Sequence, residues 1–495
     1  MSNVLLIYPR WHFVSKERYL PHSMLFVASV LRQKHDVKFI DLRLNDFSEA
    51  YLNWADNICL SVGTPQIDHA LEISQTAKEN GLTTIWGGLH GTILREQTIG
   101  HPLVDVVVRG QGEATILELI DALDNNTDLS TVDGISWKNN GNIVHNKDRI
   151  PPKLSTIPDP AFDLVNLKKY LNKDPHLGDR VIDVNSSRGC PHRCAFCYIT
   201  SIYRPGYWDG FPPERIVSWL EHLDDKCKIT GFKFQDDEFF VRRSWVEEIC
   251  KALIDRGHDW KWATSARVDY AYRWGDDFLE MINKAGCRRI QLGIESGSQR
   301  MLDLMKKDIK IEQIVPAIEK IKKHGIAGMC NFIIAAPSET KQDLYATWKL
   351  MNKIKKIDPN SITRAVNIFT PYPGTELYDL CMRMGWKQPE RLEEWGSMDI
   401  QRDLYDYPWV PEERREFIRV VLLSMDASMN KSKLAIPFRI ATELRLRTGF
   451  WAAPVELKAM TKLGKMYMRM KTKKLHESMD KRAEEEEPQE IKVQV

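Results

Sequence analysis

The feature that most constrains this chain is a group of three cysteines, Cys190, Cys194 and Cys197, within Arg188-Gly-Cys-Pro-His-Arg-Cys-Ala-Phe-Cys197. Their C-x3-C-x2-C spacing brings three thiolates together on one short loop. Iron–sulfur clusters are held by cysteine thiolates, and three ligands for four irons leave one iron open to chelate a small molecule. The spacing therefore predicts a [4Fe-4S] cluster with one accessible iron.

Other uses of the triplet fit less well. A structural zinc site usually has a second pair of Cys or His ligands, and His192 inside the triplet would give poor tetrahedral geometry. A disulfide is disfavoured because the chain has the features of a cytoplasmic protein. The remaining cysteines stand singly, and we expect them to be small core hydrophobes. They are Cys59, Cys227, Cys250, Cys287, Cys330 and Cys381.

Composition excludes several classes of protein. A chain of 495 residues predicts two to four domains, and a net charge of +2 with 43% apolar residues gives no sign of nucleic-acid binding. The amino terminus lacks the pattern of a secretory signal. No apolar run approaches about 18 residues, so a membrane span is not expected. We expect a cytoplasmic protein with no nucleic-acid partner.

Residues 1–135 alternate short apolar runs with helical patterns. Strands are expected at 4–8, 37–41, 58–62, 83–86 and 104–108, and helices at 23–33, 67–79 and 114–123. This alternation predicts a parallel, Rossmann-like sheet covered on both faces.

Three loops at the carboxyl ends of these strands carry candidate binding residues, because ligands of such sheets lie there. Glycines in the loops allow close approach of the backbone to a ligand. The first strand has no G-x-G-x-x-G after it, so a dinucleotide site is poorly supported. A lone His90 beside two glycines is often structural, and an alternative is that the domain is empty or binds substrate. The candidates are Ser61, Gly63, Thr64, Gly87, Gly88, His90, Gly110, Gly112 and Glu113.

Residues 136–175 are expected to form a linker that includes a hairpin with Asn140-Gly141 at its turn. A second alternation of strands and helices occupies residues 176–385 and predicts a partial barrel of six parallel strands. The expected strands are 181–186, 231–235, 261–265, 289–293, 329–335 and 365–369.

Polar residues follow these strands, where active groups of barrels gather. Asp236 and Asp237 are expected to accept a bond from a ligand ammonium group, or to cap the next helix. Arg267 has the geometry to pair with a ligand carboxylate, and a salt bridge with Asp269 or Glu295 is the alternative. Glu295 is a candidate for bonding ribose hydroxyls or an ammonium group.

The triplet, together with the strings GIESGS, ARVD, PYPGTELY, GGLH and GQGE, resembles the cobalamin-binding radical S-adenosylmethionine (radical SAM) enzymes over about residues 1–385. The resemblance implies an α/β chain with an N-terminal Rossmann-like cobalamin-binding domain, a radical SAM (β/α)6 partial TIM barrel and a C-terminal helical domain. It also implies three cofactors: a [4Fe-4S] cluster on the three cysteines, S-adenosylmethionine near Asp236, Asp237, Arg267 and Glu295, and cobalamin at the N-terminal loops.

Two departures from the family pattern concern the cobalamin loops. Gln111 stands where an acidic residue is common, and the D-x-H-x-x-G motif that supplies a histidine to cobalt in other cobalamin proteins is absent. The resemblance therefore implies that the Thr64–Gln66 loop faces the corrin without a histidine on cobalt.

The function implied is methylation of a weakly reactive carbon of a small-molecule or lipid-like substrate, through a 5′-deoxyadenosyl radical and methylcobalamin. An alternative in the same family is oxidative cyclisation or ring rearrangement without methyl transfer. An alternative of another class is a non-catalytic iron–sulfur or corrinoid carrier. Family members receive electrons from a flavodoxin- or ferredoxin-type reductant, and we expect the same partner here.

Residues 386–480 are expected to form a helical domain, and 481–495 a disordered tail. Within the helical domain, residues 431–475 combine many Lys and Arg with apolar side chains. Such a stretch fits peripheral contact with the inner membrane face, and a solvated helix face is the alternative.

Replacing Cys190 with Ala is expected to abolish cleavage of S-adenosylmethionine, because two thiolates cannot hold the cube. After anaerobic loading with iron and sulfide, the Cys190→Ala variant should lack the cluster absorption near ~400 nm. It should also form no 5′-deoxyadenosine. Zinc in anaerobically purified wild-type protein would contradict the cluster.

Overall fold

The amino-terminal sheet has seven strands in the order β2-β1-β3-β4-β5-β6-β7. The computed structural model describes residues 1–12, 18–358, 362–396, 407–412, 414, 415, 418 and 440. Strands β1 to β5 run parallel, which confirms all five strands expected from the apolar runs. Their bounds are β1 Asn3–Tyr8, β2 Asp36–Asp41, β3 Asn57–Ser61, β4 Thr83–Gly87 and β5 Val106–Val108.

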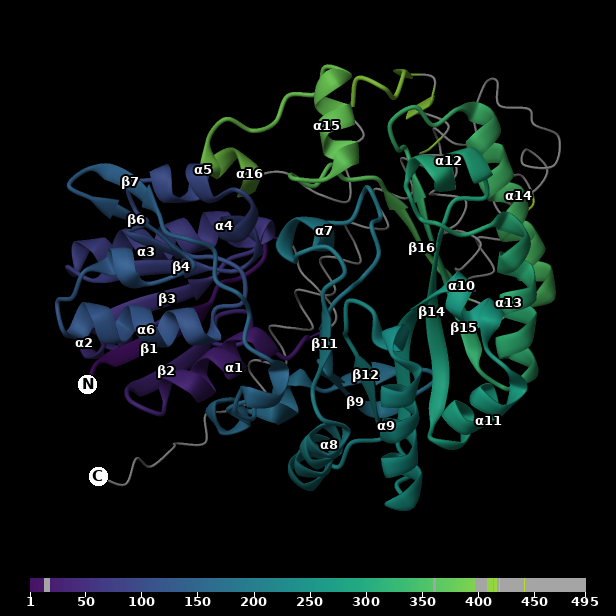
Figure 1. Cartoon of the computed structure of the whole chain (residues 1–495), viewed down its shortest axis with the longest axis horizontal. Coiled ribbons are helices and arrows are strands. Elements are labelled where there is room, and N and C mark those ends of the chain that lie inside the picture. Colours follow the sequence, from purple (N-terminus) through teal and green to yellow (C-terminus); the bar gives the residue numbers. More distant parts are fainter. Residues whose placement is uncertain are drawn as a thin grey trace. The chain divides into compact units, whose positions relative to one another are not determined.

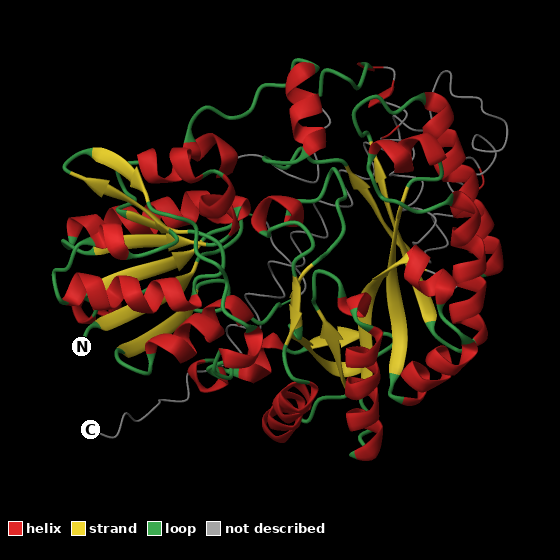
Figure 2. Ribbon diagram, in the orientation of Figure 1, coloured by secondary structure: helices red, strands yellow, loops and turns green. Residues whose placement is uncertain are grey.

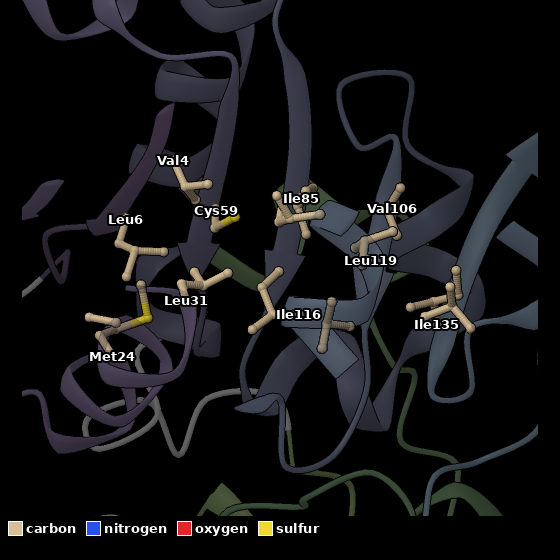
Figure 3. Packing of buried hydrophobic residues seen from close by; sticks show 14 of the residues in the cluster. Val4, Leu6, Met24, Leu31, Cys59, Ile85, Val106, Ile116, Leu119 and Ile135 are labelled. Carbon is tan, nitrogen blue, oxygen red and sulfur yellow. The ribbon is translucent and has the colours of Figure 1, made fainter. Parts of the chain in front are cut away.

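The helices between these strands pack an apolar core onto the sheet. Side chains of α1 and α6 meet those of the central strands in one cluster, as Met24, Cys59, Ile85 and Ile116 show in Figure 3. Each fully buried aliphatic side chain contributes about 1.5–3 kcal/mol. The helices are α1 His22–Leu31, α2 Ala50–Trp54, α3 Ile67–Glu79, α4 Leu89–Ile93, α5 Arg95–Gly100 and α6 Glu113–Asp124.

The expected hairpin is present and extends the same sheet. Strands β6 (Ile135–Asn139) and β7 (Asn142–His145) are antiparallel, and β6 pairs with β5. Asn140 and Gly141 both have positive φ, at 49° and 84°, as a two-residue type I′ turn requires. The sheet therefore continues through His145, and the limits of the expected linker stay a prediction.

The second sheet has the order β16-β15-β14-β13-β12-β9-β8. Six of its strands are parallel neighbours, which confirms the partial barrel, and β8 is an additional antiparallel strand from the expected linker. The strands are β8 Asn172–Asp174, β9 Gly178–Val184, β12 Gly231–Phe234, β13 Lys261–Arg267, β14 Cys287–Glu295, β15 Ala327–Ile334 and β16 Ile362–Ile368.

Helices alternate with these strands along the chain (Figures 1 and 2). They are α8 Pro213–Cys227, α9 Arg243–Asp255, α11 Asp276–Lys284, α13 Ile311–Lys323 and α14 Lys341–Ile357. Residues Met1–Trp409 form one compact unit, so both sheets belong to it. Helices α15 (Glu376–Arg383) and α16 (Leu392–Gly396) follow the barrel. The expected tail and most of the expected C-terminal domain, including the basic stretch, lie outside the described residues.

The turn after β4 depends on a glycine. Gly88 has φ 97° and ψ −172°, a conformation open essentially to glycine alone. A Cβ added there would lie 2.7 Å from the Val62 nitrogen and 2.8 Å from its carbonyl oxygen. These distances mean that the loops after β3 and β4 touch through their backbones at the carboxyl edge of the sheet.

Gly88→Ala is expected to destabilise the chain by about 2–4 kcal/mol, because backbone strain and a clash with Val62 add. Gly81→Ala is the matched control: Gly81 also has a positive φ, of 75°, but an added Cβ has no atom within 4 Å. The control should lose only about 1 kcal/mol. Urea unfolding followed by circular dichroism measures both, and equal shifts would contradict the close contact.

Candidate functional site

The three cysteines lie between β10 (Ser187–Gly189) and the short helix α7 (Ile199–Ile202). All three are free thiols, and Cys194 is buried. The Ala195 backbone fixes the loop: its N–H donates to the Met305 carbonyl at 2.8 Å, and its carbonyl accepts from Leu377 at 2.9 Å. Backbone groups of Met305, in the barrel, and of Leu377, in the helix α15 (Glu376–Arg383) that follows it, thus hold the loop.

The thiols fit a cluster better than a single ion. Among the described residues, no three Cys, His, Asp or Glu side chains are close enough to chelate one metal ion. Zinc needs its donors about 2.0–2.3 Å from one centre, whereas each thiolate of a cubane ligates a different iron. Burial raises the pKa of Cys190 to about 12 and that of Cys197 to about 11. These thiols therefore ionise at neutral pH only with a strong cationic group beside them.

Asp236, just after β12, anchors the strand that leads into the loop. Its carboxylate accepts from the Ser186 N–H at 2.7 Å, from the Ser187 hydroxyl at 2.8 Å and from the Ser186 hydroxyl. Burial raises its pKa to about 6, while the serine hydrogen bonds favour the ionised form. With its oxygens engaged in this way, Asp236 positions the loop; a bond to a ligand ammonium group stays a prediction.

Asp237 continues the same anchor. One of its oxygens accepts from the Gly189 N–H at 2.7 Å, one residue before the first cysteine. The alternative that these aspartates cap the next helix is wrong. That cap is Glu238, whose carboxylate accepts from the Phe240 N–H at 3.2 Å.

Arg267, at the end of β13, forms the salt bridge that was its alternative assignment. Its Nε lies 2.9 Å from the Asp269 carboxylate. Its Nη2 donates to the Lys307 carbonyl, and its Nη1 lies 3.7 Å from the Cys194 sulfur. Arg267 therefore reaches the cluster loop itself, and pairing with a ligand carboxylate stays a prediction.

Glu295 ends β14 with a positive φ of 64°. Its carboxylate pairs with Lys307 Nζ at 2.8 Å, and both side chains are buried. The salt bridge from Glu295 to Arg267 is not the one formed. A bond from Glu295 to a ribose or ammonium group stays a prediction.

A cavity of about 550 Å³ lies at the carboxyl edge of the amino-terminal sheet. This volume is within the range of cofactor sites. Thr64 and His90, also predicted, are not among the lining residues, whereas Asp237 is. The other residues predicted in the three loops of the amino-terminal sheet line it: Ser61, Gly63, Gly87, Gly88, Gly110, Gly112 and Glu113. Asp236, Arg267 and Glu295 do not.

The facing wall of the cavity comes from the cysteine loop and α7. Tyr198, directly after the last cysteine, lines it together with Ile199, Ile202 and Tyr203. Sequence reasoning missed the α7 residues, because no local pattern tells which helix faces a distant sheet. One cavity is therefore shared by the loops of the amino-terminal sheet and the helix that follows the cluster loop.

His90 lies against the Thr64 loop and is not among the residues that line the cavity. It is buried, its Nδ1 lies 3.1 Å from the Thr64 hydroxyl, and its ring packs edge-on against Trp395. Burial lowers its pKa to about 4, so it is neutral at pH 7. His90 thus holds the Thr64 loop. A contact between its ring and a cofactor stays a prediction.

A second cavity, of about 720 Å³, lies at the opposite edge of the sheet, beside the first residues of β3 and β4. Ligands of such sheets bind beyond the carboxyl ends. The residues that flank the triplet, Arg188 and Tyr198, line the smaller cavity and not this one. The smaller cavity is therefore the candidate cofactor site.

Comparisons with known proteins agree with this geometry. A radical SAM superfamily model matches residues 184–351, and a B12 binding domain model matches residues 14–120. An uncharacterized methyltransferase of Pyrococcus horikoshii, PH0819, is 31% identical over 74% of this chain and 81% of its own.

Two further relatives differ in activity. An anaerobic magnesium-protoporphyrin IX monomethyl ester cyclase of Rubrivivax gelatinosus is 29% identical, over 76% of this chain and 69% of its own. A hopanoid C-3 methylase of Methylococcus capsulatus is 26% identical, over 72% and 67%.

The solved structure of OxsB, a cobalamin-dependent S-adenosylmethionine radical enzyme with aqua-cobalamin and S-adenosylmethionine bound, supports the same fold. It aligns with a TM-score of 0.69 at 20% identity, over 94% of this chain and 71% of its own. The chain belongs to the cobalamin-dependent radical SAM methyltransferases and related cyclases, and its cofactors are a [4Fe-4S] cluster, S-adenosylmethionine and cobalamin.

Proposed function

We propose that this enzyme transfers a methyl group to a weakly reactive carbon of a small-molecule substrate. The observation that carries the proposal is the shared cavity, where loops of the B12 binding domain face the helix directly after the cluster cysteines. When bound, the cluster supplies the electron that cleaves S-adenosylmethionine, and cobalamin supplies the methyl group. A relative that is 31% identical is itself named an uncharacterized methyltransferase.

The chain's own residues hold and orient these groups. Cys190, Cys194 and Cys197 would ligate the cluster, and Asp236 and Asp237 fix the backbone on its amino-terminal side. Side chains such as Ile199 and Ile202 give the cavity an apolar wall. Such a wall keeps water from a reactive radical, which protects it from side reactions.

Cyclisation without methyl transfer is the second candidate, because one relative is a cyclase. A non-catalytic carrier is excluded by membership in this enzyme family. The two enzymatic reactions differ in the fate of S-adenosylmethionine. Only methyl transfer consumes a second molecule of it and releases S-adenosylhomocysteine.

Anaerobic protein with a complete cluster, hydroxocobalamin, reductant and S-adenosylmethionine is incubated with a metabolite extract of cells that lack this chain. We expect 5′-deoxyadenosine and S-adenosylhomocysteine together, and one metabolite heavier by one methylene unit in mass spectrometry. Cys190→Ala protein is the control. Turnover with 5′-deoxyadenosine but without S-adenosylhomocysteine would favour the cyclase.

We infer that the reductant is a flavodoxin- or ferredoxin-type protein, as in the family.

No helix among the described residues has the length and apolar character to cross a membrane. Peripheral binding through residues 431–475, with a lipid-like substrate, stays a proposal supported by their basic and apolar composition. Sedimentation with anionic vesicles, and its loss on removal of 431–495, tests it.

Arg267 has a second task in this scheme. Its guanidinium directs an N–H toward the Cys194 sulfur at 3.7 Å. Hydrogen bonds and positive charge near the sulfurs favour the reduced cluster. Asp269 keeps a partner without Arg267, because Arg273 Nη2 lies 2.9 Å from its other oxygen.

Arg267→Gln is expected to lower the midpoint potential of the cluster. If the reduced cluster loses about 1–2 kcal/mol of stabilisation, its midpoint potential falls by about 40–90 mV for a one-electron couple. Redox titration followed by electron paramagnetic resonance measures it. The matched control is Arg193→Gln: Arg193 precedes Cys194 in sequence but is exposed and pairs with Asp308. An unchanged potential in Arg267→Gln protein with an intact cluster would contradict this role.

A further inference from the structure

One ion pair connects the cluster loop with the cobalamin turn. Arg188, two residues before Cys190, places Nη2 2.6 Å from Oε1 of Glu113, the first residue of α6. The two side chains are 14% and 4% exposed. The Arg188 guanidinium also lies over the Phe26 ring, 5.1 Å from its centroid. Residues 75 positions apart in sequence thus meet in a nearly dry site.

The Glu113 carboxylate is only half satisfied. Its other oxygen, Oε2, is buried and has no hydrogen-bond donor among the described residues. A buried charged oxygen without a donor costs several times the net contribution of an ordinary hydrogen bond. The helix dipole of α6 favours a negative charge at this position but supplies no hydrogen bond to Oε2. Because Glu113 lines the cavity, the missing donor is to be sought on the molecule that fills it.

Gln111 is a neutral second partner of Arg188, so Glu113 is the one anion that faces this guanidinium. Its Oε1 accepts from Arg188 Nη1 at 2.9 Å, and its Nε2 donates to the Tyr207 hydroxyl at 3.0 Å. A carboxylate at position 111, as is common in the family, would leave two anions facing one guanidinium. It would also lack the N–H that Tyr207 accepts. The amide keeps Arg188 and Glu113 matched in charge.

We propose that Glu113 Oε2 accepts a hydrogen bond from a carboxamide N–H of the corrin, and that Arg188 on the other oxygen couples cobalamin occupancy to the cluster loop. The edge of the corrin carries primary carboxamides, and a carboxylate acceptor makes such a bond charge-assisted. This inference rests on the proposed function, since it needs cobalamin in the cavity.

The coupling path is short and fully described. The Arg188 backbone lies in β10, which pairs with β11 (Trp208–Gly210). The next residue, Gly189, is held by Asp237 at 2.7 Å and precedes Cys190. A shift of the Arg188 side chain therefore acts on the backbone that presents the first cysteine. Because coupling is reciprocal, a filled cluster site must strengthen cobalamin binding by the same factor.

The test measures hydroxocobalamin affinity by its visible spectrum in two forms of the full chain. One form carries the cluster, and the other is Cys190→Ala, which cannot assemble it. We expect about tenfold tighter binding with the cluster in the wild-type background. Glu113→Gln should weaken binding about tenfold. Arg188→Gln, compared with Arg188→Gln/Cys190→Ala, should bring the ratio between the two forms close to one.

The matched control is Glu118→Gln. Glu118 is on the same helix and also pairs with an arginine, Arg149, but it is half exposed and does not line the cavity. It should change neither the affinity nor the ratio. Thermal unfolding by circular dichroism checks that each variant is folded. Glu113→Asp, which keeps the carboxylate, should recover part of the affinity if Glu113→Gln protein proves unstable.

Wild-type affinity in folded Glu113→Gln protein would overturn the proposal, because water would then satisfy Oε2. Equal affinity of the two wild-type forms would overturn the coupling. Cobinamide, which has the carboxamides but no nucleotide, should show the same loss in Glu113→Gln, and an undiminished affinity would contradict the assigned donor. Failure of the wild-type chain to bind cobalamin would instead overturn the proposed function.

Discussion

The site depends on the fixing of a cysteine loop by carboxylates from the neighbouring strand. Asp236 and Asp237 follow β12, and they hold the chain at Ser186, Ser187 and Gly189. Hydrogen bonds to a charged group contribute about 1.5–3 kcal/mol each. The pairing of β10 with β11 and the Arg188–Glu113 ion pair also hold the run between β9 and Cys190. The parallel pairing of β9 with β12 is what places donors and acceptors at the same edge.

Charges around the loop are balanced in pairs. Arg267 pairs with Asp269, and Lys307 pairs with Glu295, all within the interior. The two cations therefore bring little net charge toward the cluster. The directed N–H from Arg267 to Cys194 is then the more specific influence on the sulfurs. Burying Arg267 without Asp269 would leave the desolvation cost of its charge uncompensated. The salt bridge to Asp269 therefore also stabilises Arg267 in its buried position.

Local sequence pattern was enough to predict the strands of the two sheets and the hairpin. Each of these elements depends on residues that are close together in sequence. The strand that begins at Thr83 and the turn at Gly88, for example, follow from an apolar run and a glycine pair. The sequence did not decide between alternative partners for one side chain. Whether Arg267 pairs with Asp269 or Glu295, and which residue caps the helix at Phe239, depends on side chains brought together by folding. The Arg188–Glu113 pair is of this kind as well.

At the Thr64 loop, an expectation from the sequence and the observed structure can be compared directly. The absence of D-x-H-x-x-G gave the expectation of a cobalt without histidine, and His90 was a candidate binding residue of the neighbouring loop. In the structure His90 is buried, neutral and bonded to Thr64. Among the described residues that line the cavity there is no histidine. The loop therefore presents Gly63, Pro65 and Gln66 to the cavity, and Gln66 is itself tied to the Pro9 carbonyl at 2.7 Å. A corrin bound here would meet backbone and amide groups of this loop rather than an imidazole.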